Sequence, residues 1–134
     1  MASRQEIVIH PESWEKHRYT FSDAAVKEGK KIIAISGVTS EDEAGHTMYP
    51  GDIEAQCRFI YQRIEGMLKA AGATFDDVIK TTDYVTPEGF KDYGKTTKVR
   101  REFFKGRYPA ATGIIVNRLI HDDWLIEIDA IAVV

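Results

Sequence analysis

Residues 124–134 constrain the fold more than any other segment, because their pattern fits one kind of strand. Apolar, often β-branched side chains fill this run, and two acids, Glu127 and Asp129, interrupt it. Alternate side chains of a β-strand point to opposite faces of the sheet, so both acids share one face. The residues predicted to share the other face, against helices, are Trp124, Ile126, Ile128, Ala130 and Ala132. The acid-bearing face must then look into a polar space or onto another chain.

A second apolar run, residues 108–119, precedes this strand. The polar segment His121-Asp122-Asp123 lies between the two runs and predicts a turn. We therefore expect the two runs to form a hairpin.

Two helices are predicted upstream. Apolar side chains recur three and four positions apart over residues 53–71, and Gly72 follows, which is the pattern of an amphipathic helix closed by a glycine. The second helix is expected over residues 90–105. The side chains that it should bury are Tyr93, Val99, Phe103 and Phe104.

The remaining strands complete the order of elements. Short β-like runs lie at residues 6–10, on both sides of Gly29 within residues 24–37, and at residues 78–85. The predicted order is βββαβαββ, an α+β fold whose mixed sheet carries both helices on one face. The other face has no partner inside the chain, so we expect oligomerisation with polar clefts between subunits.

Length and composition set further limits. A chain of 134 residues has room for one domain, residues 1–134, and no apolar run approaches the roughly 20 residues of a membrane helix. The N-terminus lacks the apolar core of a secretory signal, and the lone cysteine, Cys57, cannot form an internal disulfide, so a cytoplasmic location is expected. A net charge of -3 argues against a dedicated nucleic-acid binder. The four histidines are scattered without metal-ligand spacing, so no metal site is predicted.

Several short motifs resemble one known family. They lie at residues 35–37, 68–72, 77–82, 108–110 and 126–132. In this order, from about Phe21 to the C-terminus, they are similar to the RidA family, also called YjgF or reactive intermediate deaminases. The resemblance implies a chorismate-mutase-like fold, a homotrimer around a central barrel, and small-molecule clefts at the subunit interfaces. It also implies hydrolysis of imines and enamines to a carbonyl product and ammonia, with no metal or organic cofactor.

The family's site residues carry over only in part. Ser36 and Gly37 match its cleft-lining Ser-Gly pair, and Glu127 matches the catalytic glutamate that holds the attacking water. Ala111 stands where the family has the arginine that clamps a substrate carboxylate. Thr112 follows, and Gly113 replaces the usual cysteine, although its backbone N–H remains a donor.

Two further cleft positions also differ. Phe21 stands at the position of the cleft tyrosine, with Tyr19 nearby, and Thr97 stands at the position of the cleft asparagine. Alanine cannot replace the bidentate arginine fork, so we expect small 2-imino acids to be weak substrates. The ligand should carry a less acidic or differently placed polar group.

Other arginines of the chain could take the place of the missing clamp. Strand alternation would place Arg118 on the opposite face from Ala111, roughly 23 Å along at about 3.3 Å per residue, which makes it a poor substitute. Arg107, or an arginine of a neighbouring subunit, remains a candidate to replace the clamp. Asp129 is expected to be structural, Cys57 to pack in the core, and Ser36 to form strand-end hydrogen bonds.

Two other classes of function remain as alternatives. One is a non-catalytic trimer that binds a small molecule. The other is an RNA-binding, endoribonuclease-type protein that uses a basic stretch on the second helix, although a solvated helix face is the favoured interpretation. The basic residues in question are Lys95, Lys98, Arg100, Arg101, Lys105 and Arg107.

Overall fold

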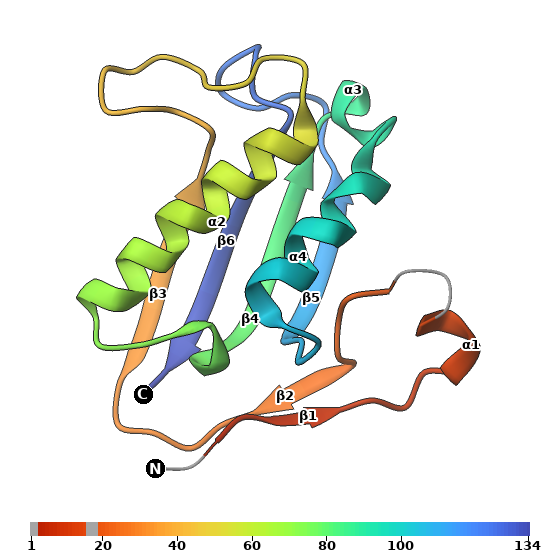
Figure 1. Cartoon of the computed structure of the whole chain (residues 1–134), viewed down its shortest axis with the longest axis vertical. Helices are drawn as coiled ribbons and strands as arrows, with labels where there is room; N and C mark the ends of the chain where they lie inside the picture. Colours follow the sequence, from red (N-terminus) through yellow and green to blue (C-terminus); the bar gives the residue numbers. More distant parts are fainter. Residues whose placement is uncertain (1–2, 16–18) are drawn as a thin grey trace.

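The computed structural model describes residues 3–15 and 19–134, and its main feature is a four-stranded sheet (Figure 1). The strands lie in the order β3-β6-β4-β5. Strand β6 is antiparallel to both of its neighbours, whereas β5 runs parallel to β4, so the sheet is mixed. The bounds are β3 Ile32–Val38, β4 Val78–Val85, β5 Ala110–Ile115 and β6 Ile126–Val133. A separate two-stranded sheet pairs β1 (Gln5–Ile7) with β2 (Ala24–Val26).

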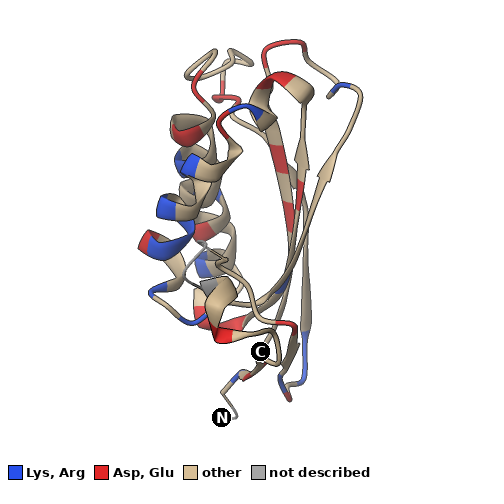
Figure 2. Cartoon of the chain, turned by 90° about the vertical axis from the view of Figure 1, so that its right-hand side faces the viewer, with Lys and Arg blue, Asp and Glu red and all other residues tan. Residues whose placement is uncertain are grey.

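Helices α2 (Ile53–Ala70) and α4 (Thr96–Phe104) cover one face of the large sheet, as the edge-on view in Figure 2 shows. The shorter helical pieces are α1 (Glu12–Glu15), η1 (Phe75–Asp77), α3 (Pro87–Phe90) and η2 (Tyr93–Lys95). With these short pieces set aside, the element order is βββαβαββ. The predicted α+β architecture is therefore confirmed. Of the helices that the structure describes, none is long and apolar enough to cross a membrane.

Helix α2 follows its sequence pattern closely. The Asp52 side chain accepts a hydrogen bond from the Ala55 amide at 3.0 Å, which caps the first turn. Gly72 adopts a left-handed φ of 76° just after the C-cap, a conformation that glycine reaches without a Cβ clash. The side chains buried against the sheet include Ile53, Cys57, Ile60, Ile64 and Leu68. Cys57 therefore packs in the core, as expected.

The predicted hairpin between the last two strands is wrong. Strand β4 lies between β5 and β6, because Asp83 is in register with Gly113 on one side and Tyr84 with Glu127 on the other. The connection over residues 116–125 is long enough to pass the end of β4, so a tight hairpin is not needed. Helix α4 lies between β4 and β5 in the chain and provides the crossover that parallel strands require.

The predicted second helix is also broken where the sequence pattern appeared continuous. Helix α3 ends at Phe90, a single 3-10 turn follows over Tyr93–Lys95, and α4 begins only at Thr96. Gly94, a weak helix former, lies inside that turn. The predicted end is correct, because Lys105 adopts a left-handed φ of 55° immediately after α4.

The N-terminal strands are arranged differently from the expectation. The predicted strand at residues 6–10 is shorter, because β1 stops at Ile7 and the amides of Ile9 and His10 donate to the Asp23 carboxylate instead. The strands on the two sides of Gly29 both form, but β2 pairs with β1 and β3 pairs with β6.

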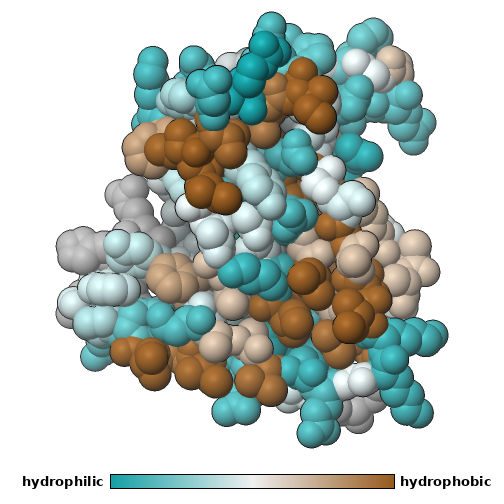
Figure 3. Space-filling model, turned by 180° about the vertical axis from the view of Figure 1, so that it is seen from behind, coloured by the Kyte–Doolittle hydropathy of each residue, from teal (hydrophilic) through white to brown (hydrophobic). Residues whose placement is uncertain are grey.

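The alternation predicted for the last strand is confirmed. Side chains of β6 that face the helices are buried, namely Ile126, Ile128, Ala130 and Ala132. Glu127 and Asp129 alternate with these residues and lie on the open face. Figure 2 shows the acidic positions as bands along the strands. Trp124 lies before the start of β6 rather than on it and is half-buried. The open face also exposes Ile32 and Ile131, and Figure 3 shows hydrophobic patches among polar residues on this side of the molecule.

Candidate functional site

The Glu127 side chain lies in a hollow on the open face of the sheet. The hollow is lined by Gly37, Tyr84, Arg118, Glu127 and Asp129, among others. A Cβ atom added at Gly37 would come within 2.8 Å of the Glu127 Cδ atom, so a larger residue here would force the carboxylate to shift. Ser36, beside Gly37 on β3, is exposed and lines a neighbouring hollow. The structure thus places Gly37 beside Glu127, with Ser36 in the adjoining hollow.

The two acids of β6 have different surroundings. The Tyr84 hydroxyl donates a hydrogen bond to Asp129 Oδ2 at 2.9 Å. No group among the described residues forms a hydrogen bond with the Glu127 carboxylate, and its partial burial, together with the negative charge of Asp129, raises its pKa. Asp129 is therefore tied to the scaffold, whereas Glu127 has lone pairs free for a water or a substrate.

The remaining predicted site residues line a second hollow, of about 380 Å³, between α4, β5 and the segment at residues 19–21. The residues brought together there are Tyr19, Phe21, Thr97, Ala111, Thr112 and Gly113. Below, this space is called the α4 cavity. It opens on the other side of β4 from Glu127, since Asp83 points toward the helices and Tyr84 toward the open face. One chain alone does not bring Glu127 to Ala111 and Gly113.

Arg100, which the sequence predicts on a basic helix face, lies in this cavity. Arg100 is only 5% exposed and lines the space beside Ala111. Its Nε donates to the Thr20 carbonyl at 3.0 Å, and its Nη1 donates to the Tyr61 hydroxyl at 2.7 Å and to Thr81 Oγ1 at 3.1 Å. The crossing of α4 over the sheet thus brings a guanidinium into the same cavity as Ala111.

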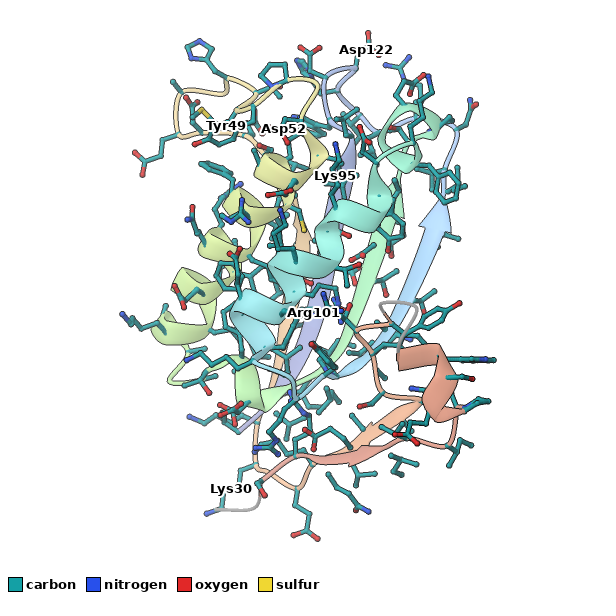
Figure 4. All side chains as sticks on the ribbon, turned by 45° about the vertical axis from the view of Figure 1, so that its right-hand side comes forward. Lys30, Tyr49, Asp52, Lys95, Arg101 and Asp122 are labelled. Carbon is teal, nitrogen blue, oxygen red and sulfur yellow. The ribbon has the colours of Figure 1, made fainter. Side chains whose placement is uncertain are left out.

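The prediction that Arg100 belongs to a basic surface patch on the second helix is wrong, because this side chain is buried. The signal that could have placed it is helical spacing: Thr96, Arg100 and Phe104 lie four positions apart and are all buried. Lys98 forms an ion pair with Glu54 at 3.2 Å. Figure 4 marks Lys95 and Arg101 near this helix; Lys95 pairs with Asp92 at 3.3 Å.

An acid and a tyrosine, also missed from the sequence, complete the polar lining of the α4 cavity. The Tyr93 hydroxyl donates to Asp83 Oδ2 at 2.6 Å. Burial raises the pKa of Asp83, although the charge of Arg100 opposes that shift. A Cβ atom at Gly113 would lie 2.7 Å from the Tyr93 hydroxyl oxygen, so the glycine makes room for the Tyr93–Asp83 hydrogen bond.

The other candidate arginines have different surroundings. Strand β5 ends at Ile115, so the strand geometry expected for Arg118 does not apply; Arg118 instead lines the Glu127 hollow and pairs with Asp122 at 2.6 Å. Arg107 pairs with Glu6 at 3.0 Å and does not line the α4 cavity. Across residues 3–15 and 19–134, no cluster of three or more His, Cys, Asp or Glu side chains suited to a metal ion occurs.

A mixed sheet with two helices on one face, a carboxylate on its open face and a polar cavity under α4 defines a class of small α+β proteins. The family model described as Endoribonuclease L-PSP matches residues 15–134. A RutC family protein of Pyrococcus abyssi is 34% identical over 108 residues, which is 81% of this chain and 82% of that relative. The chain belongs to the RidA/YjgF family.

Solved structures agree with this assignment. The Rid family protein YyfB of Yersinia pestis, described as a protein of unknown function, superposes with a TM-score of 0.82 at 28% identity and 98% coverage of both chains. RidA of an Antarctic Psychrobacter gives a TM-score of 0.70 at 26% identity, covering 87% of this chain and 89% of that chain. The chorismate-mutase-like fold expected from the sequence is thereby confirmed.

Proposed function

We propose that this protein hydrolyses reactive imines or enamines to a carbonyl compound and ammonia, without a metal or organic cofactor. The observation that carries the proposal is the Glu127 carboxylate, which lies against Gly37 with no hydrogen-bond partner among the described residues and with a raised pKa. A carboxylate with these properties is suited to hold a water and to take its proton. The substrate is a ligand other than the small 2-imino acids typical of the family.

The chemistry requires few groups, because a protonated C=N bond already accepts water. Glu127 orients the water and removes a proton from it as the water oxygen bonds to the imine carbon. The nitrogen of the resulting carbinolamine takes that proton back from Glu127, and the C–N bond breaks. The hydroxyl proton passes to the departing ammonia as the carbonyl forms. The Gly113 N–H or the Ser36 hydroxyl fixes the substrate, and proximity supplies most of the acceleration.

The site requires a second copy of the chain. Glu127 lies on the open face, whereas Ala111 and Gly113 line the α4 cavity on the other side of β4. The open face is also unusually apolar for a free surface, with Ile32 77% exposed and Ile131 39% exposed. We therefore propose a homotrimer in which the carboxylate of one subunit meets the α4 cavity of its neighbour.

Ammonia release from freshly generated imines tests this proposal. We expect Glu127→Gln to lower the rate by about 10²-fold or more, since the amide cannot take a proton. The matched control is Glu88→Gln on α3, an exposed acid outside both hollows, which should keep the wild-type rate. Equal rates for wild-type protein and Glu127→Gln would contradict the role of Glu127.

The two alternative classes have less support. Burial of Arg100 and the ion pairs of Lys98 and Arg107 remove free positive charge from the stretch that would contact RNA phosphates. A non-catalytic binding trimer would bind a ligand in the α4 cavity but release no ammonia from any imine.

A further inference from the structure

We infer that the α4 cavity recognises a neutral ligand group that carries a hydrogen-bond acceptor beside a donor, such as a carboxamide, held between Arg100 and Asp83. This inference rests on the proposed function, because it names the ligand chemistry of the same cleft.

The free hydrogen-bonding capacity of Arg100 is confined to one nitrogen. Nε and Nη1 are engaged by Thr20, Tyr61 and Thr81, and the guanidinium carbon lies 5.0 Å from the ring centre of Phe104. Nη2 is buried and has no partner. A bidentate carboxylate contact needs N–H groups on two guanidinium nitrogens, so Arg100 cannot act as the family's carboxylate fork. Its free donors are the two N–H groups of Nη2.

Asp83 offers the complementary atom. Its Oδ2 accepts from Tyr93, whereas its Oδ1 is buried without a partner. Arg100 and Asp83 both line the α4 cavity, so the two buried, unpartnered atoms belong to side chains that line one space. Buried polar groups are almost always paired in native proteins, and a group that accepts from Nη2 and donates to Oδ1 would satisfy both.

The charges of the cavity disfavour an anionic ligand. Arg100 and Asp83 carry opposite charges, and each is almost fully buried. A ligand carboxylate would gain one contact with Arg100 but would meet the negative charge of Asp83 in a medium of low polarity. A carboxamide brings no charge and presents C=O and N–H₂ on adjacent atoms.

The departures from the family pattern on β5 are coordinated with this pair. Ala111 in place of arginine leaves volume beside Arg100, and Gly113 in place of cysteine admits the Tyr93 hydroxyl that holds Asp83. The guanidinium is thus supplied by α4 instead of β5, and it is accompanied by an acid.

Titration of the full-length protein with propanamide and with propanoate, followed by amide and Arg Nε–H NMR signals, tests the inference. We expect propanamide to shift the signals of Thr97, Gly113 and Arg100, with at least about tenfold higher affinity than propanoate at pH 7.5, as one opposed charge predicts. Equal or tighter binding of propanoate, or no binding of propanamide, would overturn the inference.

Two variants test whether the preference for propanamide over propanoate arises from Asp83. Asp83→Asn should lower the preference for propanamide over propanoate by about tenfold, since it removes the charge that repels the carboxylate. Arg101→Gln, which changes the exposed neighbour of Arg100 on α4 (Figure 4), should leave the preference unchanged. Loss of the preference in Arg101→Gln, or its retention in a folded Asp83→Asn, would count against the pair.

The inference about ligand binding and the proposed hydrolysis can be refuted independently of each other. Glu127→Gln should still bind propanamide, because the contacts inferred for the carboxamide come from Arg100 and Asp83 and not from Glu127. A wild-type protein that binds propanamide but releases no ammonia would refute the proposed hydrolysis and leave the inference standing. Hydrolysis with a preference for propanoate would do the reverse.

Discussion

At the scale of single residues, the behaviour of Glu127 depends on its neighbours Gly37 and Asp129. Gly37 leaves the space that the carboxylate occupies, and Asp129 adds a negative charge on the same face of β6. Partial burial and this charge both raise the pKa of Glu127 above its usual value of 4.5. The proposed base is therefore ionised only above this raised pKa, and ammonia release should fall as the pH drops through it.

Removing the charge of Asp129 should move the pH at which activity is lost on the acidic side of the pH–rate profile, here called the acidic limb. In Asp129→Asn the repulsion that favours protonated Glu127 is gone, so the pKa of Glu127 falls and the limb shifts to lower pH. The measurement is the pH profile of kcat/KM between pH 4 and 8 for wild type and variant. An unchanged limb, or one moved to higher pH, would show that Glu127 is not the group that titrates.

At the scale of elements, the sequence predicted each helix and strand better than it predicted their neighbours in space. The alternation in β6 and the helical spacing in α2 are local patterns, and both are confirmed. The pairing of β4 between β5 and β6 depends on contacts between distant segments, which no local pattern encodes. The same reason explains why Arg100 was misplaced: its charge indicated solvent, while the crossing of α4 over the sheet buried it.

The connection between β5 and β6 is fixed to α2 by one buried side chain. Gln56, which is fully buried, donates to the Asp123 carbonyl and accepts from the Leu125 amide, both at 2.9 Å. Gln56→Leu would leave both backbone groups without partners and should cost about 2–4 kcal/mol of unfolding free energy, measured by urea denaturation. Gln62→Leu, at an exposed position of α2, is the control and should change stability by less than about 0.5 kcal/mol. A similar loss in both variants would refute the role of Gln56.

At the scale of the whole molecule, the sheet separates the residues that the chemistry needs to bring together. The alternation of β6 predicted a sheet face that no element of the same chain covers. The structure shows this face with the acids of β6 and with apolar patches (Figures 2 and 3). Which subunit supplies which half of a cleft could not be predicted from local patterns, because they do not describe surfaces between chains. We propose that each working site combines Glu127 of one subunit with the α4 cavity of another.

Two inactive variants, mixed in one oligomer, test whether the site is shared between subunits. Glu127→Gln lacks the base, and Thr97→Trp fills the α4 cavity from a half-buried position on α4. Each variant alone should release almost no ammonia, but an equimolar mixture refolded together should regain about a quarter of the wild-type rate, since a quarter of randomly formed interfaces join two intact halves. A mixture as inactive as its parents, with mixed oligomers demonstrated by native mass spectrometry, would contradict a site shared between subunits.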